Sequence, residues 1–344
     1  MKVLFLHPNT PDYLTAGLFH GLRSLLGPQC VDLPRFDGMY APLTPAMRSK
    51  IRGRGFTLYG LLPDLPELAA ERFFIWQHGI VHYDYYIIAD IWRHYPVLEQ
   101  LRKVVPAQKI VIIDPADTPR LFPYNDMRQR WPHLLRLRNL LKGCKMYYKR
   151  EWMPQEVGSS TGLPPLLVKA LAGQPLPLPV MPISFSIPAQ KITVVSPAAK
   201  TKDFVHNIVD AEVSEALQGS FHTPLGQQQY AFDTEEAYYA DIQASRYGIT
   251  TRRSGWDCLR HYELAANGAL LCFKNLQHKP AGCAPHGLQP ASNCIAYNNF
   301  AHLKQQLETL SPATYQQLQQ QGYAWVQQHT TLALAKRFME ELNT

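Results

Sequence analysis

The sequence has no long hydrophobic run, and this absence excludes a membrane-spanning helix. No stretch of about 18 consecutive apolar residues occurs in its 344 residues. The apolar run within residues 1–8 is too short for the core of a secretory signal peptide, and Asp12 follows soon after it. We therefore expect a cytoplasmic protein, with peripheral contact to the inner face of a membrane as a further option.

Cysteine is scarce and lacks the spacing of a metal site. Four of the six cysteines lie between Cys258 and Cys294 with histidines interspersed, but no C-x-x-C pair occurs. Structural zinc sites generally use such closely spaced pairs. We expect reduced thiols that are buried as small apolar side chains, and no metal.

Acidic residues are missing from one long stretch of a chain whose net charge is +7. Residues 127–150 contain no Asp or Glu, and they hold eight basic residues: Arg128, Arg130, Arg136, Arg138, Lys142, Lys145, Lys149 and Arg150. Leucines at helical spacing give the same stretch an apolar face. Three interpretations stay open: a solvated helix, a face for anionic lipid headgroups, or a face for nucleic-acid phosphates. No nucleic-acid-binding motif accompanies the charge.

The first half of the chain alternates short apolar segments with helical patterns. The segments predict strands at residues 3–6, 73–76, 85–89 and 109–113, and helices at residues 14–26 and 97–104. Such alternation indicates βαβ units around a parallel sheet, whose functional residues follow the carboxyl ends of the strands. Five residues are expected on that rim: His7, Asp12, Asp90, Asp114 and Asp117.

Seven prolines between Pro164 and Pro188 indicate a connection between two domains near residues 170–188. The boundaries that follow are residues 1–175 and 176–329, with a last helix near residues 330–344 that packs back on the first domain. In the second domain we predict strands at 192–195, 269–273 and 295–297. Helices are predicted at 204–217, 303–310 and 315–328.

The stretch from Ser254 to Gly268 carries the most information. Ser254, with Asp257 three residues later, predicts the capped start of a helix, and Asn267-Gly268 predicts its end. Arg260, Glu263 and Asn267 form a polar stripe at i, i+3 and i+7. A helix N-terminus attracts phosphate, and a carboxylate further along the helix can accept the hydroxyls of a ribose. The stretch therefore predicts a nucleotide site.

Arg260-x-x-Glu263, followed by Ala265-Ala266-Asn267-Gly268 and an apolar strand, resembles the donor-site signature "E-A-x-A-x-G" of GT-B glycosyltransferases. The group-1 and spore-maturation-protein-like branches are the most similar. Leu264 replaces the first Ala, and Ser245-Arg-Tyr-Gly248 stands where many members carry an upstream acidic residue. The resemblance implies an α/β protein with two Rossmann-like domains facing across a cleft. It implies no metal and no cofactor besides a nucleotide sugar as donor.

The resemblance also assigns roles to residues. Glu263 would bind the ribose, while Arg260 or Arg253, Lys200 and the amides of Gly255 and Trp256 would hold the diphosphate. These groups would stabilise the negative charge of the leaving nucleotide.

An acceptor hydroxyl needs a base if the reaction inverts the anomeric centre. Asp12 and Asp117 are the first candidates, and His286 is a candidate contact to the transferred sugar. The predicted function is transfer of a hexose to an envelope polysaccharide or lipid-linked glycan. The alternative is a glycosyltransferase acting on a nucleic-acid base, with the basic stretch holding phosphates. The oligomeric state stays open.

Overall fold

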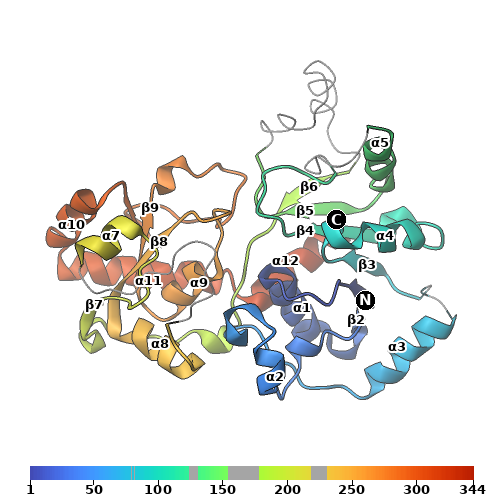
Figure 1. Cartoon of the computed structure of the whole chain (residues 1–344), viewed down its shortest axis with the longest axis horizontal. Coiled ribbons are helices and arrows are strands. Elements are labelled where there is room, and N and C mark those ends of the chain that lie inside the picture. The colour runs from blue at the N-terminus through green and yellow to red at the C-terminus, as the bar shows by residue number, and fades with distance from the viewer. Residues whose placement is uncertain (79, 81, 124–130, 154–177, 218–230) are drawn as a thin grey trace. The chain divides into compact units, whose positions relative to one another are not determined.

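The computed structural model describes residues 1–78, 80, 82–123, 131–153, 178–217 and 231–344 (Figure 1). The chain forms two compact units. Unit 1 comprises Met1–Ser184, Pro280–Ala284 and Leu334–Thr344, and unit 2 comprises Phe185–Lys279 and Pro285–Ala333. Most of the proline-rich stretch, and the domain boundary predicted at residues 175 and 176, lie outside the described residues.

Unit 1 is built on a six-stranded parallel sheet with the order β2-β1-β3-β4-β5-β6. The strands are β1 (Val3–Leu6), β2 (Cys30–Leu33), β3 (Tyr85–Ile88), β4 (Ile110–Asp114), β5 (Met146–Lys149) and β6 (Val180–Pro182). The helices are α1 (Tyr13–Leu26), α2 (Pro45–Arg48), α3 (Glu67–His78), α4 (Ile91–Leu101) and α5 (Trp131–Leu140), with short 3-10 turns η1 (Gly27–Gln29), η2 (Asp37–Met39), η3 (Arg52–Gly55) and η4 (Ala107–Lys109). β2 lies on one side of β1, whereas the next strand along the chain, β3, lies on the other side. The strand order thus reverses between β1 and β3, and such a topological switch point is where α/β sheets place their ligands.

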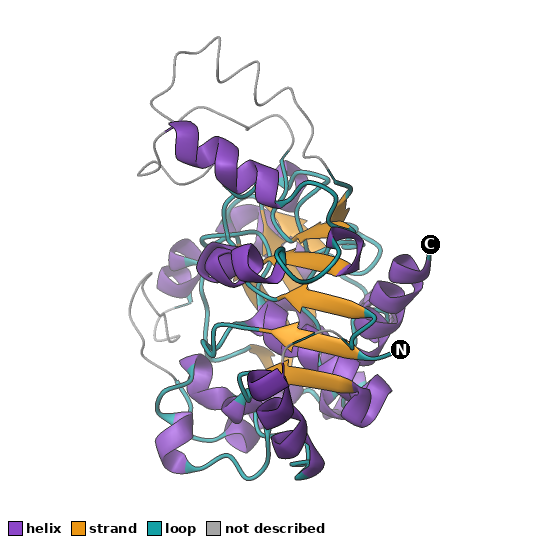
Figure 2. Cartoon of the chain, turned by 90° about the vertical axis from the view of Figure 1, so that its right-hand side faces the viewer, coloured by secondary structure: helices purple, strands orange, loops and turns teal. Residues whose placement is uncertain are grey.

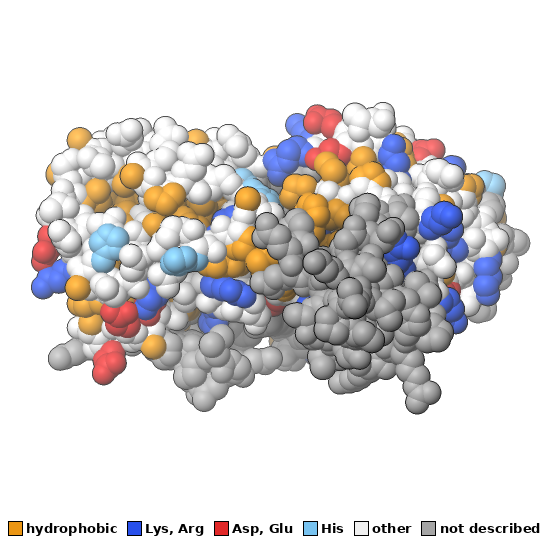
Figure 3. Space-filling model, turned by 90° about the horizontal axis from the view of Figure 1, so that it is seen from above, with side chains coloured by type: hydrophobic (Ala, Val, Ile, Leu, Met, Phe, Trp, Pro, Cys, Tyr) orange, Lys and Arg blue, Asp and Glu red, His pale blue; other side chains and the backbone are white. Residues whose placement is uncertain are grey.

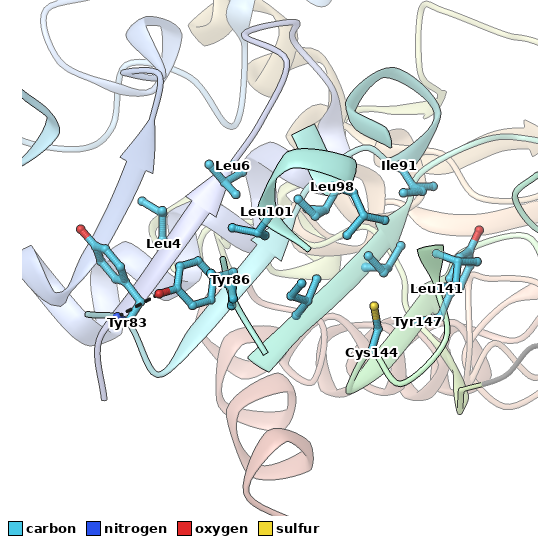
Figure 4. Packing of buried hydrophobic residues seen from close by; sticks show 14 of the residues in the cluster. Leu4, Leu6, Tyr83, Tyr86, Ile91, Leu98, Leu101, Leu141, Cys144 and Tyr147 are labelled. Carbon is cyan, nitrogen blue, oxygen red and sulfur yellow. Dashed lines mark hydrogen bonds between the residues drawn. The ribbon is translucent and has the colours of Figure 1, made fainter. Parts of the chain in front are cut away.

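Apolar strands explain why this sheet lies inside the unit. Every residue of β1 and β4 is buried, as expected where helices cover both faces of a parallel sheet. Figure 2 shows the strands side by side with helices around them. In Figure 4, Leu4, Leu6 and Tyr86 of the sheet gather with Leu98 and Leu101 of α4 in one core cluster.

Two local predictions in unit 1 were wrong. Residues 73–76 belong to α3, not to a strand, because a four-residue apolar run does not distinguish the two. Phe73 and Phe74 are 58% and 47% exposed on that helix. The helix expected at 97–104 begins at Ile91, because the carboxylate of Asp90 accepts the backbone N–H groups of Trp92 and Arg93.

The basic stretch does not form a single face. Arg128 and Arg130 lie outside the described residues, while Lys149 and Arg150 are only 0% and 1% exposed. On the face drawn in Figure 3, Lys and Arg side chains stand at several separate places. Of the three interpretations left open for this stretch, the two that involve a lipid or nucleic-acid partner have no support in the described part of the chain.

The C-terminal helix α12 (Thr331–Asn343) belongs to unit 1 from Leu334 onward. The Tyr85 hydroxyl donates to the Leu342 carbonyl at 2.7 Å, and the Tyr148 hydroxyl donates to Glu341 at 2.7 Å. These contacts join the end of the chain to the sheet of unit 1.

Unit 2 contains a four-stranded parallel sheet with the order β10-β9-β8-β7. The strands are β7 (Lys202–Phe204), β8 (Ser245–Thr251), β9 (Leu270–Lys274) and β10 (Ile295–Tyr297). The helices are α7 (Ala211–Ala216), α8 (Glu235–Ala244), α9 (Leu259–Ala266), α10 (Phe300–Glu308) and α11 (Pro312–Gln327), with 3-10 turns η6 (Ala189–Lys191), η7 (Pro197–Ala199) and η8 (Leu276–His278). The predictions for β9, β10, α10, α11 and α12 are confirmed to within a few residues.

Two predictions in unit 2 were wrong. Residues 192–195 form no strand: Thr193 donates its N–H to the Ala266 carbonyl and Val195 to the Tyr323 hydroxyl, while Val194 is 76% exposed. The helix expected over 204–217 is reduced to α7, because Phe204 ends β7.

Candidate functional site

Helix α9 begins later than its sequence suggests. Its N-cap is Cys258, without a side-chain cap bond, so Ser254 lies outside the helix. Asp257 does not cap the helix, because its carboxylate accepts the Phe185 N–H at 2.8 Å and the Tyr262 hydroxyl at 2.9 Å. The predicted end is confirmed: Asn267 is the C-cap and Gly268 has φ 73°.

The carboxylate of Glu263 is held from a neighbouring helix. Glu263 is 7% exposed, and its Oε2 accepts the hydroxyl of Tyr238 at 2.7 Å. Burial, followed by the charge of Glu263, raises the pKa of Tyr238 well above its usual value, so this hydroxyl stays a donor. One turn before Glu263, Arg260 also hydrogen-bonds Tyr238. The nearby acidic groups outweigh burial and raise the pKa of Arg260, so the guanidinium stays charged.

The loop between β8 and α9 is a packed structure. Trp256 is 5% exposed and stacks on Phe273 of β9, with ring centroids 6.2 Å apart. The guanidinium of Arg252 lies 5.4 Å from the centroid of the Trp256 ring. Arg253 donates its N–H to the carbonyl of Gly255 at 3.0 Å, so Arg253 and Gly255 share one turn. This loop thus holds Arg252 against the Trp256 ring and Arg253 in a turn with Gly255.

Lys200 does not join these residues. Lys200 is 6% exposed, and its ammonium donates to the Asn267 carbonyl at 3.1 Å and to the Ile242 carbonyl at 3.4 Å. Burial lowers its pKa to about 8. Asn267 follows the C-terminal end of α9, about 12 Å of helix away from its start. The contacts of Lys200 thus tie α8 to the end of α9.

In unit 1, Asp12 caps α1 at the edge where β1 ends. Its Oδ1 accepts the Thr15 N–H at 2.9 Å. Burial raises the pKa of Asp12 above its usual value, and Arg150 and Asp90 are close enough to act on it electrostatically. Asp12 follows β1 and Asp90 follows β3 as the N-cap of α4, so both lie at the carboxyl ends of the two strands that flank the switch point.

Asp117 and Asp114 lie on the same edge with different surroundings. Asp117 is half-exposed and pairs with Arg150, which also donates to Glu151 at 3.0 Å. Asp114 is fully buried; it pairs with Lys149 at 3.0 Å and accepts the Trp92 indole N–H at 2.8 Å. We therefore assign Asp114 to the core of the unit.

The candidate residues His7 and His286 both take part in hydrogen bonds that involve the backbone. His7 is buried, its Nε2 lies 2.7 Å from the Pro34 carbonyl, and burial lowers its pKa to about 4. His286 lies in the loop after β9, where its carbonyl accepts the Trp325 indole N–H at 2.7 Å. This second contact fixes the backbone of the loop.

Two residues of these clusters escaped the sequence analysis. Tyr238 stands 25 positions from Glu263, and no local pattern connects them. Arg150 was hidden in the basic stretch, because its burial depends on the place of β5 in the sheet.

Two further searches cover only the part of the chain that the structure describes. No group of three or more His, Cys, Asp or Glu side chains there is arranged to hold a metal ion. No helix there is long and apolar enough to cross a membrane.

Comparison with solved structures gives matches over the whole chain. HepE of Anabaena, in complex with UDP and glucose, is 12% identical, covers 100% of both chains and has a TM-score of 0.57. Sucrose-phosphate synthase of Thermosynechococcus elongatus is 12% identical over 99% of this chain and 98% of its own, with a TM-score of 0.53. A UDP-forming trehalose-phosphate synthase of Burkholderia xenovorans is 11% identical over 100% and 99%, with a TM-score of 0.55. No protein-family model and no curated protein matches the sequence. The chain therefore has the fold of the GT-B glycosyltransferases.

Proposed function

We propose that this protein transfers a sugar from a nucleotide sugar to an acceptor. The observation that carries the proposal is the Glu263 carboxylate of α9, which accepts the hydroxyl of Tyr238 within a GT-B fold. The start of α9 has no side-chain cap. HepE binds UDP, UDP with glucose, and UDP-glucose. A UDP-hexose is therefore the first donor to test.

On the donor side, Glu263 accepts the ribose hydroxyls, because a carboxylate can accept two of them at once. The Tyr238 hydroxyl holds the carboxylate in place. Arg260, Arg253 and the amides of Gly255 and Trp256 surround the diphosphate at the start of α9, where the helix dipole favours negative charge. Lys200 is left out, since its ammonium is engaged at the opposite end of the helix. These cations stabilise the leaving nucleotide without a metal.

On the acceptor side, Asp12 is the proposed base. A carboxylate whose pKa is raised by burial holds a proton more strongly than an exposed one, which suits proton abstraction near neutral pH. Asp117 and its partner Arg150 would position the acceptor beside it. His286 stays a predicted contact to the transferred sugar. An envelope polysaccharide or a lipid-linked glycan remains the proposed class of acceptor, and the cytoplasm the proposed location.

Replacement of Glu263 tests the donor site. Glu263→Gln keeps the shape of the side chain but removes the charge that accepts ribose hydroxyls. We expect UDP affinity, measured by isothermal titration calorimetry, to fall at least about tenfold, which corresponds to about 1.4 kcal/mol.

Glu236→Gln is the matched control, because Glu236 is exposed on the neighbouring helix α8 and its loss should leave affinity unchanged. Circular dichroism should show both variants folded. Unaltered UDP affinity in folded Glu263→Gln would remove Glu263 from the site and contradict the proposed function.

A further inference from the structure

Asp257 is a buried carboxylate of unit 2 that the proposed donor chemistry does not use. It directly follows Gly255 and Trp256, whose amides are proposed to hold the diphosphate, and it is 6% exposed. Its Oδ2 accepts the N–H of Phe185 at 2.8 Å, and its Oδ1 accepts the hydroxyl of Tyr262 at 2.9 Å. Burial of a carboxylate is costly unless hydrogen bonds compensate for it, so these two bonds fix the side chain in place.

The first of these two partners belongs to a segment that is itself held firmly. Residues 185–187 are buried. Ile187 donates its N–H to the His329 carbonyl at 3.1 Å, and its own carbonyl accepts the N–H of Thr331 at 2.9 Å. The Asp257 carboxylate is thus anchored to a backbone that further hydrogen bonds keep in position.

The second partner, Tyr262, lies inside α9. Its side chain is fully buried, and its ring stacks on that of Trp325 in α11 with centroids 5.0 Å apart. Because the ring cannot turn without leaving this stack, its hydroxyl is a fixed donor to Asp257. Tyr262 directly precedes Glu263, so this hydrogen bond joins the loop to the part of α9 that carries the proposed ribose ligand.

The loop is also held just before Asp257. The Trp256 ring stacks on Phe273, and the Gly255 carbonyl accepts the N–H of Arg253 at 3.0 Å. The amides of Gly255 and Trp256 therefore belong to a stretch that is fixed by the Trp256 ring and by the Asp257 carboxylate. Donors that are fixed before a ligand arrives bind it without the cost of ordering them.

We propose that Asp257 is a positioning residue of the donor site. Its two hydrogen bonds hold the amides of Gly255 and Trp256 in the orientation that receives the diphosphate. The inference rests on the proposed function, since it deepens the account of the same site. Asp257 acts through these amides and not by direct contact, because a carboxylate repels a diphosphate.

The sign of the effect separates positioning from simple electrostatics. Removal of a negative charge near the diphosphate would by itself strengthen UDP binding, since like charges repel. Loss of the two hydrogen bonds would instead allow the loop to turn its amides away, which weakens UDP binding. A fall in UDP affinity after removal of the Asp257 carboxylate is therefore specific to positioning.

Calorimetry with UDP on the full chain tests this inference with Asp257→Ala, Tyr262→Phe and the double variant. Asp203→Ala is the control for the first, because Asp203 is exposed on β7. Tyr315→Phe is the control for the second. Tyr315 is a buried tyrosine of α11 whose hydroxyl donates to the Arg246 carbonyl at 3.2 Å, so its loss also removes one hydrogen bond from unit 2.

We expect UDP affinity to fall at least about tenfold in Asp257→Ala and about threefold in Tyr262→Phe, and to stay unchanged in both controls. The double variant should bind UDP no more weakly than Asp257→Ala alone, because the Tyr262 hydroxyl acts on the loop through the carboxylate. A role in stability alone would lower the free energy of unfolding, measured in urea, without this pattern of UDP affinities.

The inference is overturned if folded Asp257→Ala binds UDP as tightly as the wild type or more tightly. If circular dichroism shows that Asp257→Ala does not fold, Tyr262→Phe decides: UDP affinity equal to that of the wild type or of Tyr315→Phe overturns the inference. In either case, weaker UDP binding by Glu263→Gln would leave the proposed function in place. A wild-type protein that does not bind UDP would contradict the proposed function as well.

Discussion

Gly268 carries the chain out of α9 with φ 73°, and its surroundings leave no room for a side chain. A Cβ there would lie 2.3 Å from the Tyr323 hydroxyl and 3.0 Å from Gln319 Nε2. We expect Gly268→Ala to lower the free energy of unfolding by roughly 2–4 kcal/mol, since left-handed strain and a steric clash add together.

Gly143→Ala is the control for this substitution in a urea titration. Gly143 also has a positive φ, of 78°, but its nearest neighbour is Ala107 Cβ at an ordinary 3.5 Å. Gly143→Ala should lower the free energy of unfolding only by the cost of a left-handed alanine, about 1 kcal/mol. An equal loss of unfolding free energy in the two variants would show that Tyr323 moves aside without destabilising the protein.

Two buried histidines make the stability of unit 1 depend on pH. Burial lowers the pKa of His7 and of His20 to about 4, whereas both titrate near 6.5 in an unfolded chain. Between these values the unfolded state binds protons that the folded state does not. The free energy of unfolding therefore falls as pH drops from about 6.5 to about 4, by up to about 1.4 kcal/mol per pH unit for each histidine.

Urea unfolding of the wild type and of His20→Leu at pH 7 and pH 5 measures this effect. The variant should lose less stability between the two pH values, because one of the two protonations is gone. Equal losses in both proteins would show that His20 is not buried as a neutral ring.

At the scale of elements, α9 packs closely against β8 because residue 248 of that strand is a glycine. A Cβ at Gly248 of β8 would lie 2.6 Å from a side-chain carbon of Leu264 on α9. Gly248→Ala should destabilise the protein by about 1–3 kcal/mol and shift α9, the helix that carries Glu263.

A double-mutant cycle with Leu264→Ala checks this contact. The second substitution removes the atoms that clash, so the double variant should lose less stability than the sum of the single variants, with a coupling of at least about 0.5 kcal/mol. Additive losses of stability would show that the contact between β8 and α9 at Gly248 and Leu264 is not tightly packed.

The elements also show where local patterns fail. Strands with continuous apolar runs, such as β1 and β4, were predicted nearly to the residue, because burial on both faces leaves a clear pattern. The segment 192–195 has the same pattern but pairs with no strand, since its N–H groups donate to Ala266 and Tyr323. Ser254 has the chemistry of a cap, yet Cys258 occupies the position.

At the scale of the whole molecule, the two units have separate cores, so we expect UDP to stabilise the unit that binds it more than the other. One core cluster lies in unit 1 and another in unit 2. At a hundred times its dissociation constant, UDP adds about 2.7 kcal/mol to the state that binds it. Hydrogen exchange should therefore slow by about a hundredfold at the slowest amides of unit 2.

The slowest amides of unit 1 should change much less. At the same UDP concentration, an affinity that is at least about tenfold lower should reduce the slowing in unit 2 to about tenfold or less in Glu263→Gln. Equal protection of both units would show that they unfold as one cooperative block. Protection confined to unit 1 would contradict a donor site on α9.

The sequence by itself determined the class of fold, the succession of most strands and helices, and the carboxylate on which the proposed function depends. These properties are local: they follow from apolar periodicity, from a glycine that ends a helix, and from the spacing of Arg260 and Glu263. Only the tertiary structure decided which polar residues work together. It placed Tyr238 on Glu263, paired the buried Arg150 with Asp117, and engaged Lys200 at the far end of α9. Such groupings depend on contacts between distant segments, whose burial and charge no local pattern encodes.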